Sequence, residues 1–119
     1  MKIPTSDTDI TGEIYSLLYD LGVRADTTAF FHTAYAVRLV AEQPQKLLLV
    51  TKWLYPEVAR HYHTNWKAVE RNIRRLAKTV WEKEPNALAA FASRPLLGRP
   101  TTSQFIGILA KQLSKYNAA

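Results

Sequence analysis

Apolar residues recur every three or four positions along almost the whole chain, which is the spacing of one face of an α-helix. Series of this kind run from Ile10 to Leu21, from Phe30 to Ala41 and from Phe105 to Leu113. No alternating apolar and polar run reaches the length of a β-strand. The pattern predicts an all-α fold, a compact bundle of about six helices. The expected ranges are 10–21, 27–42, 44–54, 65–84 and about 101–116, with shorter helical pieces after Pro56 and at 86–92.

Proline and capping residues indicate where these helices begin and end. Pro56 suits the first turn of a helix and should force Tyr55 toward extended geometry. Pro85 should stop the long helix that precedes it. The segment from Ser93 to Pro100 is expected to be a loop, because it combines three turn-forming residues. Thr101 and Gln104 then match a capping box at the start of the last helix.

The helix expected at 65–84 is strongly amphipathic. Its apolar positions lie on one side of the helical wheel (Val69, Ile73, Leu76 and Val80), and the other side carries five cations and one carboxylate. These charged residues are Lys67, Glu70, Arg71, Arg74, Arg75 and Lys78. Solvated helix faces usually mix charges at spacings of three and four, whereas these cations repel one another. A polyanion would supply the missing countercharge, so nucleic acid is favoured over a merely solvated face.

A short helix, a polar break and this basic helix follow one another between about residues 54 and 84, which is the layout of a helix-turn-helix. The charged residues just named (Lys67, Glu70, Arg71, Arg74 and Arg75) are expected to read DNA bases. Phosphate contacts are expected from Lys52, Thr64, Asn65, Trp66 and Lys78, with Thr64 or Asn65 also capping the helix. Glu70 could accept a hydrogen bond from cytosine or could orient a neighbouring arginine within the helix. Trp53 and Trp81 are expected in the core.

Composition is consistent with one domain over residues 1–119. The chain has 119 residues, a net charge of +6 and no cysteine, which excludes disulfides and thiolate metal sites. Between Lys52 and Lys83, eight cations face three carboxylates, a local charge of +5. The chain opens without a signal-peptide pattern, and its apolar runs are too short to span a bilayer. The absence of cysteine fits a reducing cytoplasm.

Motifs for catalysis or cofactor binding are not found. The four glycines form no phosphate loop, and no nucleophile-elbow or zincin motif occurs. His61 and His63 make a weak metal site without an acidic ligand nearby, and His32 fits a hydrogen-bonded residue at the edge of the core. We therefore expect no enzyme, no cofactor and no metal. RNA is a less favoured partner, because no aromatic platform for single strands is apparent.

The chain resembles a known family at three separate places. These are Leu54-Tyr55-Pro56-Glu57-Val58-Ala59 followed by Val69-Glu70-Arg71-x-Ile73-Arg74, then Ile10 through Gly22-Val23, and Arg99-Pro100-Thr101-Thr102-Ser103-Gln104-Phe105-Ile106. It is similar there to the C-terminal DNA-binding domain of the master sporulation response regulator of endospore-forming Firmicutes. The resemblance implies a six-helix domain that binds a short box of double-stranded DNA as a tandem pair and regulates transcription. It also implies a sigma factor of RNA polymerase as a further partner and a cytoplasmic, nucleoid-associated location in a bacterium.

Carried over by position, Glu70, Arg71 and Arg74 match the recognition motif of that family, and Arg75 stands where another basic or polar residue is common. The family usually has Arg where this chain has Ala68, so the target sequence is left open. The family's phosphoacceptor receiver domain does not precede the first helix here, which fits either a fragment or a stand-alone protein. Two functions are consistent with the sequence: a DNA-binding regulator, and a protein-interaction paralogue that modulates a full-length regulator.

Overall fold

The computed structural model describes residues 7–92 and 94–117 of the chain, and side chains over residues 10–92 and 94–113. All the regular elements of this part are helices and it contains no strand, so the all-α prediction is confirmed. Its elements are α1 (Asp7–Asp20), α2 (Thr28–Glu42), η1 (Pro44–Leu49), η2 (Val50–Leu54), α3 (Tyr55–His61), α4 (Trp66–Lys83), α5 (Pro85–Phe91) and α6 (Thr102–Asn117). Within it, no helix is long and apolar enough to cross a membrane.

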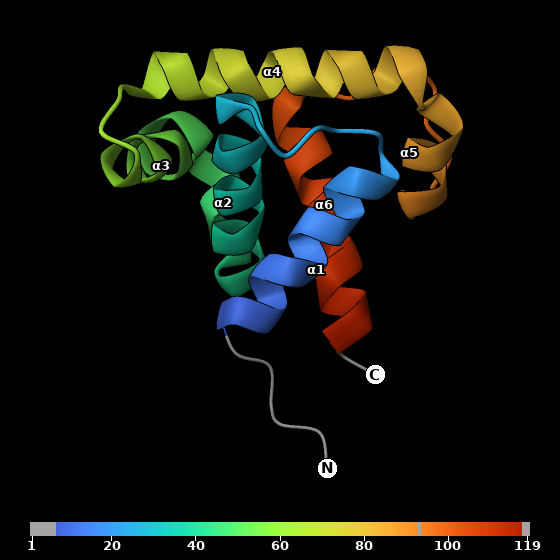
Figure 1. The fold of residues 1–119 in the computed structure, drawn as a ribbon, viewed down its shortest axis with the longest axis horizontal. Helices are drawn as coiled ribbons and strands as arrows, with labels where there is room; N and C mark the ends of the chain where they lie inside the picture. Colours follow the sequence, from blue (N-terminus) through green and yellow to red (C-terminus); the bar gives the residue numbers. More distant parts are fainter. Residues whose placement is uncertain (1–6, 93, 118–119) are drawn as a thin grey trace.

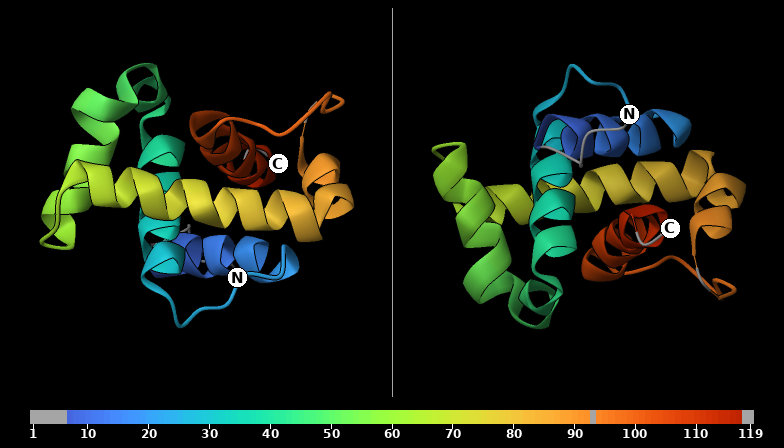
Figure 2. Two further views of the ribbon diagram at one scale, coloured as in Figure 1. Left: turned by 90° about the horizontal axis from the view of Figure 1, so that it is seen from above. Right: turned by 90° about the horizontal axis from the view of Figure 1, so that it is seen from below.

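Helix α2 forms the centre of the bundle, and α4 lies across one end of it (Figure 1). α2 packs against α1, α4 and α6, while α3 and α5 lie near the two ends of α4. Seen from above, α1 and α6 lie on opposite sides of the line of α4 (Figure 2). The whole outer face of α4 is therefore left uncovered by the other helices.

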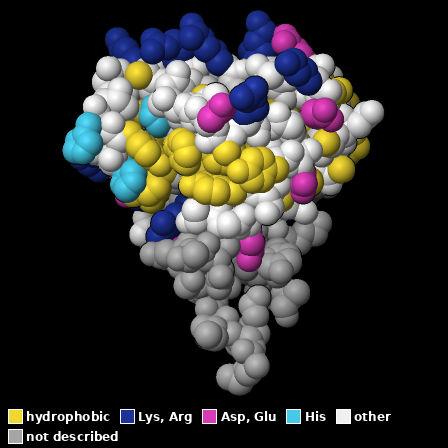
Figure 3. Space-filling model, viewed as in Figure 1, with side chains coloured by type: hydrophobic (Ala, Val, Ile, Leu, Met, Phe, Trp, Pro, Cys, Tyr) yellow, Lys and Arg dark blue, Asp and Glu magenta, His cyan; other side chains and the backbone are white. Residues whose placement is uncertain are grey.

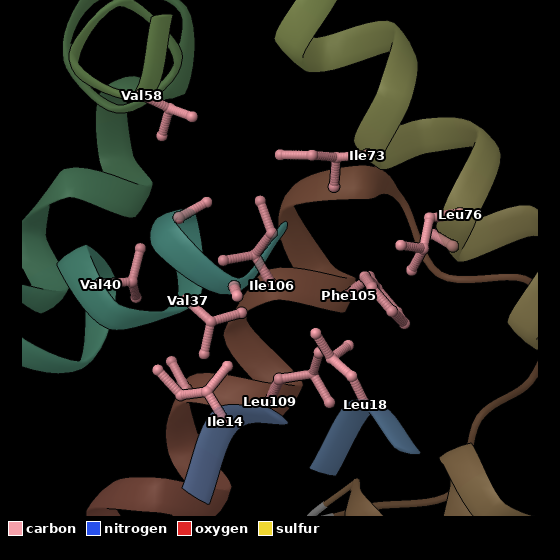
Figure 4. Packing of buried hydrophobic residues seen from close by; sticks show 14 of the residues in the cluster. Ile14, Leu18, Val37, Val40, Val58, Ile73, Leu76, Phe105, Ile106 and Leu109 are labelled. Carbon is pink, nitrogen blue, oxygen red and sulfur yellow. The ribbon is translucent and has the colours of Figure 1, made fainter. Parts of the chain in front are cut away.

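A single apolar core holds these helices together. Figure 4 shows side chains from α1, α2, α3, α4 and α6 meeting in it. Val58, Ile73, Phe105, Ile106 and Leu109 have no exposed surface. Each such side chain contributes roughly 1.5–3 kcal/mol by leaving water. The apolar faces predicted for 65–84 and for the last helix are both buried as expected.

The ends of the helices follow the local sequence closely. Gly22, at φ 80°, ends the turn after α1 in the left-handed conformation that glycine adopts without strain. Thr27 caps α2, because its Oγ1 accepts a hydrogen bond from the Phe30 backbone amide at 3.1 Å. At α6, the backbone amide of Gln104 donates to Thr101 Oγ1 at 3.2 Å, and the backbone amide of Thr101 donates to Gln104 Oε1 at 2.8 Å. The predicted capping box is confirmed.

The segment before α3 differs from the prediction. The expected helix at 44–54 is a 3₁₀ turn followed by a π-turn, and Tyr55 is helical (φ −64°, ψ −40°) rather than extended. The Tyr55 amide donates to the Val50 carbonyl, five residues back. The proline ring of Pro56 would disrupt the regular hydrogen bonds of an α-helix at this point, and the wider turn avoids that conflict. Trp53 is 50% exposed, so its predicted place in the core is wrong, whereas Trp81 is half-buried against the core.

The remaining predicted boundaries agree within one or two residues, except that α1 begins at Asp7, three residues before the predicted start at Ile10. The short helix expected at 86–92 is α5, Pro85–Phe91. The loop expected before the last helix is irregular from Arg94 to Thr101, and Ser93 lies outside the described residues. The helix expected at 65–84 is α4, and the only difference is that both end residues serve as caps. Pattern and caps together placed this helix correctly.

Candidate nucleic-acid interface

Helix α4 is fixed in orientation by its cap and its buried face. The Ala68 amide donates to Asn65 Oδ1 at 2.9 Å, which satisfies one of the free donors at the start of the helix. Val69 and Ile73 are fully buried, and Leu76, Ala77 and Val80 complete the same stripe. Rotation of α4 about its axis would expose this stripe, so its opposite face is held toward solvent.

The outward face of α4 is a row of cations. Figure 3 shows Lys and Arg side chains along the edge of the molecule that α4 forms. The structure brings together all the basic residues that the sequence placed on this face, each of them exposed: Lys67, Arg71, Arg74, Arg75 and Lys78. Among the described residues, no carboxylate pairs with any of these except Arg74. The row therefore carries charge that the protein itself does not neutralise.

Glu70 is the exception on this helix. Its carboxylate accepts a hydrogen bond from Arg74 Nη1, one turn further on, and its side chain is 26% exposed. Burial, together with the negative charge of Glu70, raises the pKa of Tyr55 to about 12. Glu70 thus lies on the side of α4 that faces α3. The intrahelical alternative for Glu70 is the arrangement that the free protein adopts.

The turn between α3 and α4 is tight and well bonded. His63 adopts a positive φ of 56°, which is uncommon for a residue other than glycine. The Thr64 amide donates to the Ala59 carbonyl at 2.9 Å, so the turn is tied back to α3. Thr64, Asn65 and Trp66 are exposed beside one another at the start of α4. Trp66 is 37% exposed, and Lys67 Nζ lies 5.9 Å from its ring centroid.

A buried polar contact links α4 to the central helix. His32 is 2% exposed, and its Nδ1 lies 3.3 Å from Asn72 Nδ2. Burial lowers the pKa of His32, so the neutral ring is favoured as a hydrogen-bond acceptor. The expectation of a hydrogen-bonded histidine is confirmed, although it is more deeply buried than a core-edge residue. The sequence did not predict a role for Asn72. Its only local feature is an amide side chain placed between the charged and apolar stripes of α4.

Two groups of predicted residues lie apart from the row on α4. Lys52 lies on η2, in a groove of about 390 Å³ that Lys46, Trp53 and Arg60 also line. His61 stacks on Tyr35 with ring centroids 4.1 Å apart and is thus part of an aromatic contact. Within the described part of the chain, no three histidine or acidic residues are grouped in a way that could hold a metal ion.

A small all-helical fold that presents an uncompensated row of cations on one uncovered helix defines a class of protein, the helical DNA-binding domains. The family model for the sporulation initiation factor Spo0A C terminal matches residues 14–113 of this chain. The chain belongs to this family of DNA-binding domains of transcription regulators in sporulation. The resemblance seen in the sequence is confirmed.

Proposed function

We propose that this protein is a sequence-specific DNA-binding transcription regulator in which α3, the turn and α4 act as a helix-turn-helix. Helix α4 enters the major groove, which is wide enough for one helix. The observation that carries the proposal is the row of exposed cations on α4 without carboxylate partners. DNA phosphates supply the countercharge that the fold does not, and release of their counterions drives binding.

Within this proposal, the position of a residue on α4 decides whether it contacts bases or phosphates. Arg71 is central on the outward face, with Lys67, Arg74 and Arg75 around it, and a guanidinium can donate two hydrogen bonds to guanine. Phosphate contacts come from Thr64, Asn65 and Trp66 at the start of α4, from Lys78 further along, and from Lys52 on η2. Ala68 offers only a methyl group, which suits a thymine methyl rather than guanine.

Glu70 has two roles open to it in the complex. Its bond to Arg74 holds that guanidinium in place, which limits the conformational entropy lost when Arg74 meets a base. If the carboxylate instead accepts from cytosine N4, Arg74 has to release it. Replacing Glu70 by Ala distinguishes these roles, because only the second predicts loss of a cytosine preference in the selected site.

Useful specificity requires more than one domain, because a single recognition helix contacts only a few base pairs. We therefore propose that two domains bind adjacent boxes in tandem. A contact with a sigma factor of RNA polymerase and an action at the bacterial nucleoid complete the proposal. Both rest on the family and on its role in transcription.

The experiment that tests this proposal compares two variants of α4 in a binding selection on random double-stranded DNA. Arg71→Ala should cost roughly 1–3 kcal/mol on the preferred site and relax its consensus. Lys78→Ala, a matched loss of one exposed cation, should weaken all sequences alike and leave the consensus unchanged. An unaltered consensus in Arg71→Ala would contradict the proposed orientation of α4. Absence of DNA binding at any salt concentration would favour a protein-interaction module.

A further inference from the structure

A groove separates α4 from the loop that joins α1 to α2, residues 21–27. Figure 1 shows this loop passing directly beneath α4, and Figure 2 shows it projecting to one side of that helix. The groove has a volume of about 360 Å³. The loop contributes Arg24 and Thr27 to its lining, and α4 contributes Arg75, Thr79 and Lys83.

This groove lies on the flank of α4 that α3 does not occupy. Glu70 lies close enough to Tyr55 of α3 for its charge to raise the pKa of the Tyr55 hydroxyl, and this marks one flank. Asn72 bonds to His32 of α2, and Arg75 and Thr79 follow on that second flank, next to the loop. A helix in the major groove has a phosphate backbone on either side. The α3 side and the loop side of α4 therefore face different DNA strands.

The rim of the groove is basic where it is nearest to the proposed reading face. Arg75 has no carboxylate partner among the described residues, and the Arg24 side chain is 81% exposed. Arg24 Nη2 donates to Asp26 Oδ2 at 3.0 Å, and this bond lowers the pKa of Asp26. Lys83 and Glu84, which carry opposite charges, line the other end of the groove. The exposed guanidinium groups of Arg24 and Arg75 therefore favour an anion at the rim nearest to the proposed reading face.

We propose that Arg24 contacts a DNA phosphate. The loop between α1 and α2 would then bind the backbone of one DNA strand, while the α3 side of α4 faces the other strand. The inference rests on the proposed function, because it presumes that α4 lies in the major groove. Asp26 holds the guanidinium at the edge of the loop in the free protein, and a phosphate replaces or shares it in the complex. The contact is with the backbone, so it adds affinity without sequence preference.

The test measures DNA affinity against salt concentration for the wild type, Arg24→Ala and Asp26→Asn. Loss of one phosphate contact reduces the slope of log affinity against log salt by about 0.9. The ratio of wild-type to variant affinity should therefore change by about eightfold for each tenfold change in salt concentration. We expect this change for Arg24→Ala on every sequence, and we expect Asp26→Asn to bind at least as tightly as the wild type. Lys111→Ala is the matched control, an exposed cation on α6 that should leave the slope unchanged.

Ethylation of individual phosphates provides a second readout. The wild type should show interference at a phosphate on one strand that Arg24→Ala no longer shows. If the wild type binds DNA and Arg24→Ala keeps both slope and interference pattern, this inference fails and the proposed function stands. Equal effects of Arg24→Ala and Lys111→Ala would also overturn it, since net charge would then explain the loss. If the wild type shows no salt-dependent binding, the proposed function fails first.

Discussion

Asn65 caps α4 and is also proposed to contact a DNA phosphate, and two substitutions at this position separate these roles. Its Oδ1 accepts from the Ala68 amide at 2.9 Å, and the same residue is proposed to lie against a DNA phosphate. Asn65→Ala removes the cap, at a cost of about 1 kcal/mol. An unfolding entropy of about 2.1 cal/mol/K per residue over 119 residues converts this cost to a fall of about 4 °C in Tm.

Asn65→Asp keeps the cap, because a carboxylate accepts the same bond and favours the positive end of the helix dipole. The free energy of unfolding should therefore stay within a few tenths of a kcal/mol of the wild type. DNA affinity should fall nonetheless. A carboxylate about 4 Å from a phosphate costs about 1 kcal/mol even at the dielectric constant of water, or about fivefold in Kd.

The assay combines urea unfolding followed by circular dichroism with DNA affinity at fixed salt. Thr101→Ala provides a control for capping alone, because it removes the acceptor of the Gln104 amide at α6. It should lose about as much stability as Asn65→Ala while binding DNA normally under conditions where it is folded. Wild-type DNA affinity in a fully stable Asn65→Asp protein would refute the placement of the turn beside the backbone.

Two further predictions concern pH. Burial holds the pKa of His32 in the folded protein below 6.5, so the unfolded chain binds more protons as the pH falls through that value. The free energy of unfolding should therefore fall as the pH drops below about 6.5. The urea midpoints at pH 7.5 and pH 5.5 should differ less in His32→Gln than in the wild type. The pKa of Tyr55 is raised to about 12, so its contribution to stability is present below pH 10 and is lost as pH rises toward 12. Tyr55→Phe should lessen this alkaline loss, and an unchanged pH dependence would contradict the burial of the hydroxyl.

Local patterns predicted much of the fold, because local interactions determine those parts. The stripe of Val69 and Ile73 defined the inner face of α4, and the capping box at Thr101 needed only two side chains three residues apart. Local rules failed just before α3. A π-turn makes Tyr55 helical in spite of Pro56, and Trp53 turns outward with it. The width of a helical turn depends on packing that periodicity does not encode.

The candidate interface was predicted only in part, for the same reason. The cations of α4 form a pattern within one helix, so the sequence grouped them correctly. The link between His32 and Asn72 joins residues forty positions apart, and the groove between Arg24 and Arg75 depends on how a loop packs against a distant helix. Such relations arise from tertiary structure and have no local signal. Only the three-dimensional arrangement shows which strand each flank of α4 would face.

The measurement that tests the central claim most directly is the salt dependence of binding to promoter DNA. With about four to seven phosphate contacts per domain, log affinity should fall with log salt at a slope of about −4 to −6 for each bound domain. This slope can be measured by titrating labelled DNA at several salt concentrations between 50 and 200 mM, roughly the range over which phosphate-dominated complexes weaken steeply. A steep fall is the result that this account predicts. An affinity insensitive to salt over that range would contradict the assignment of the basic face of α4 to DNA.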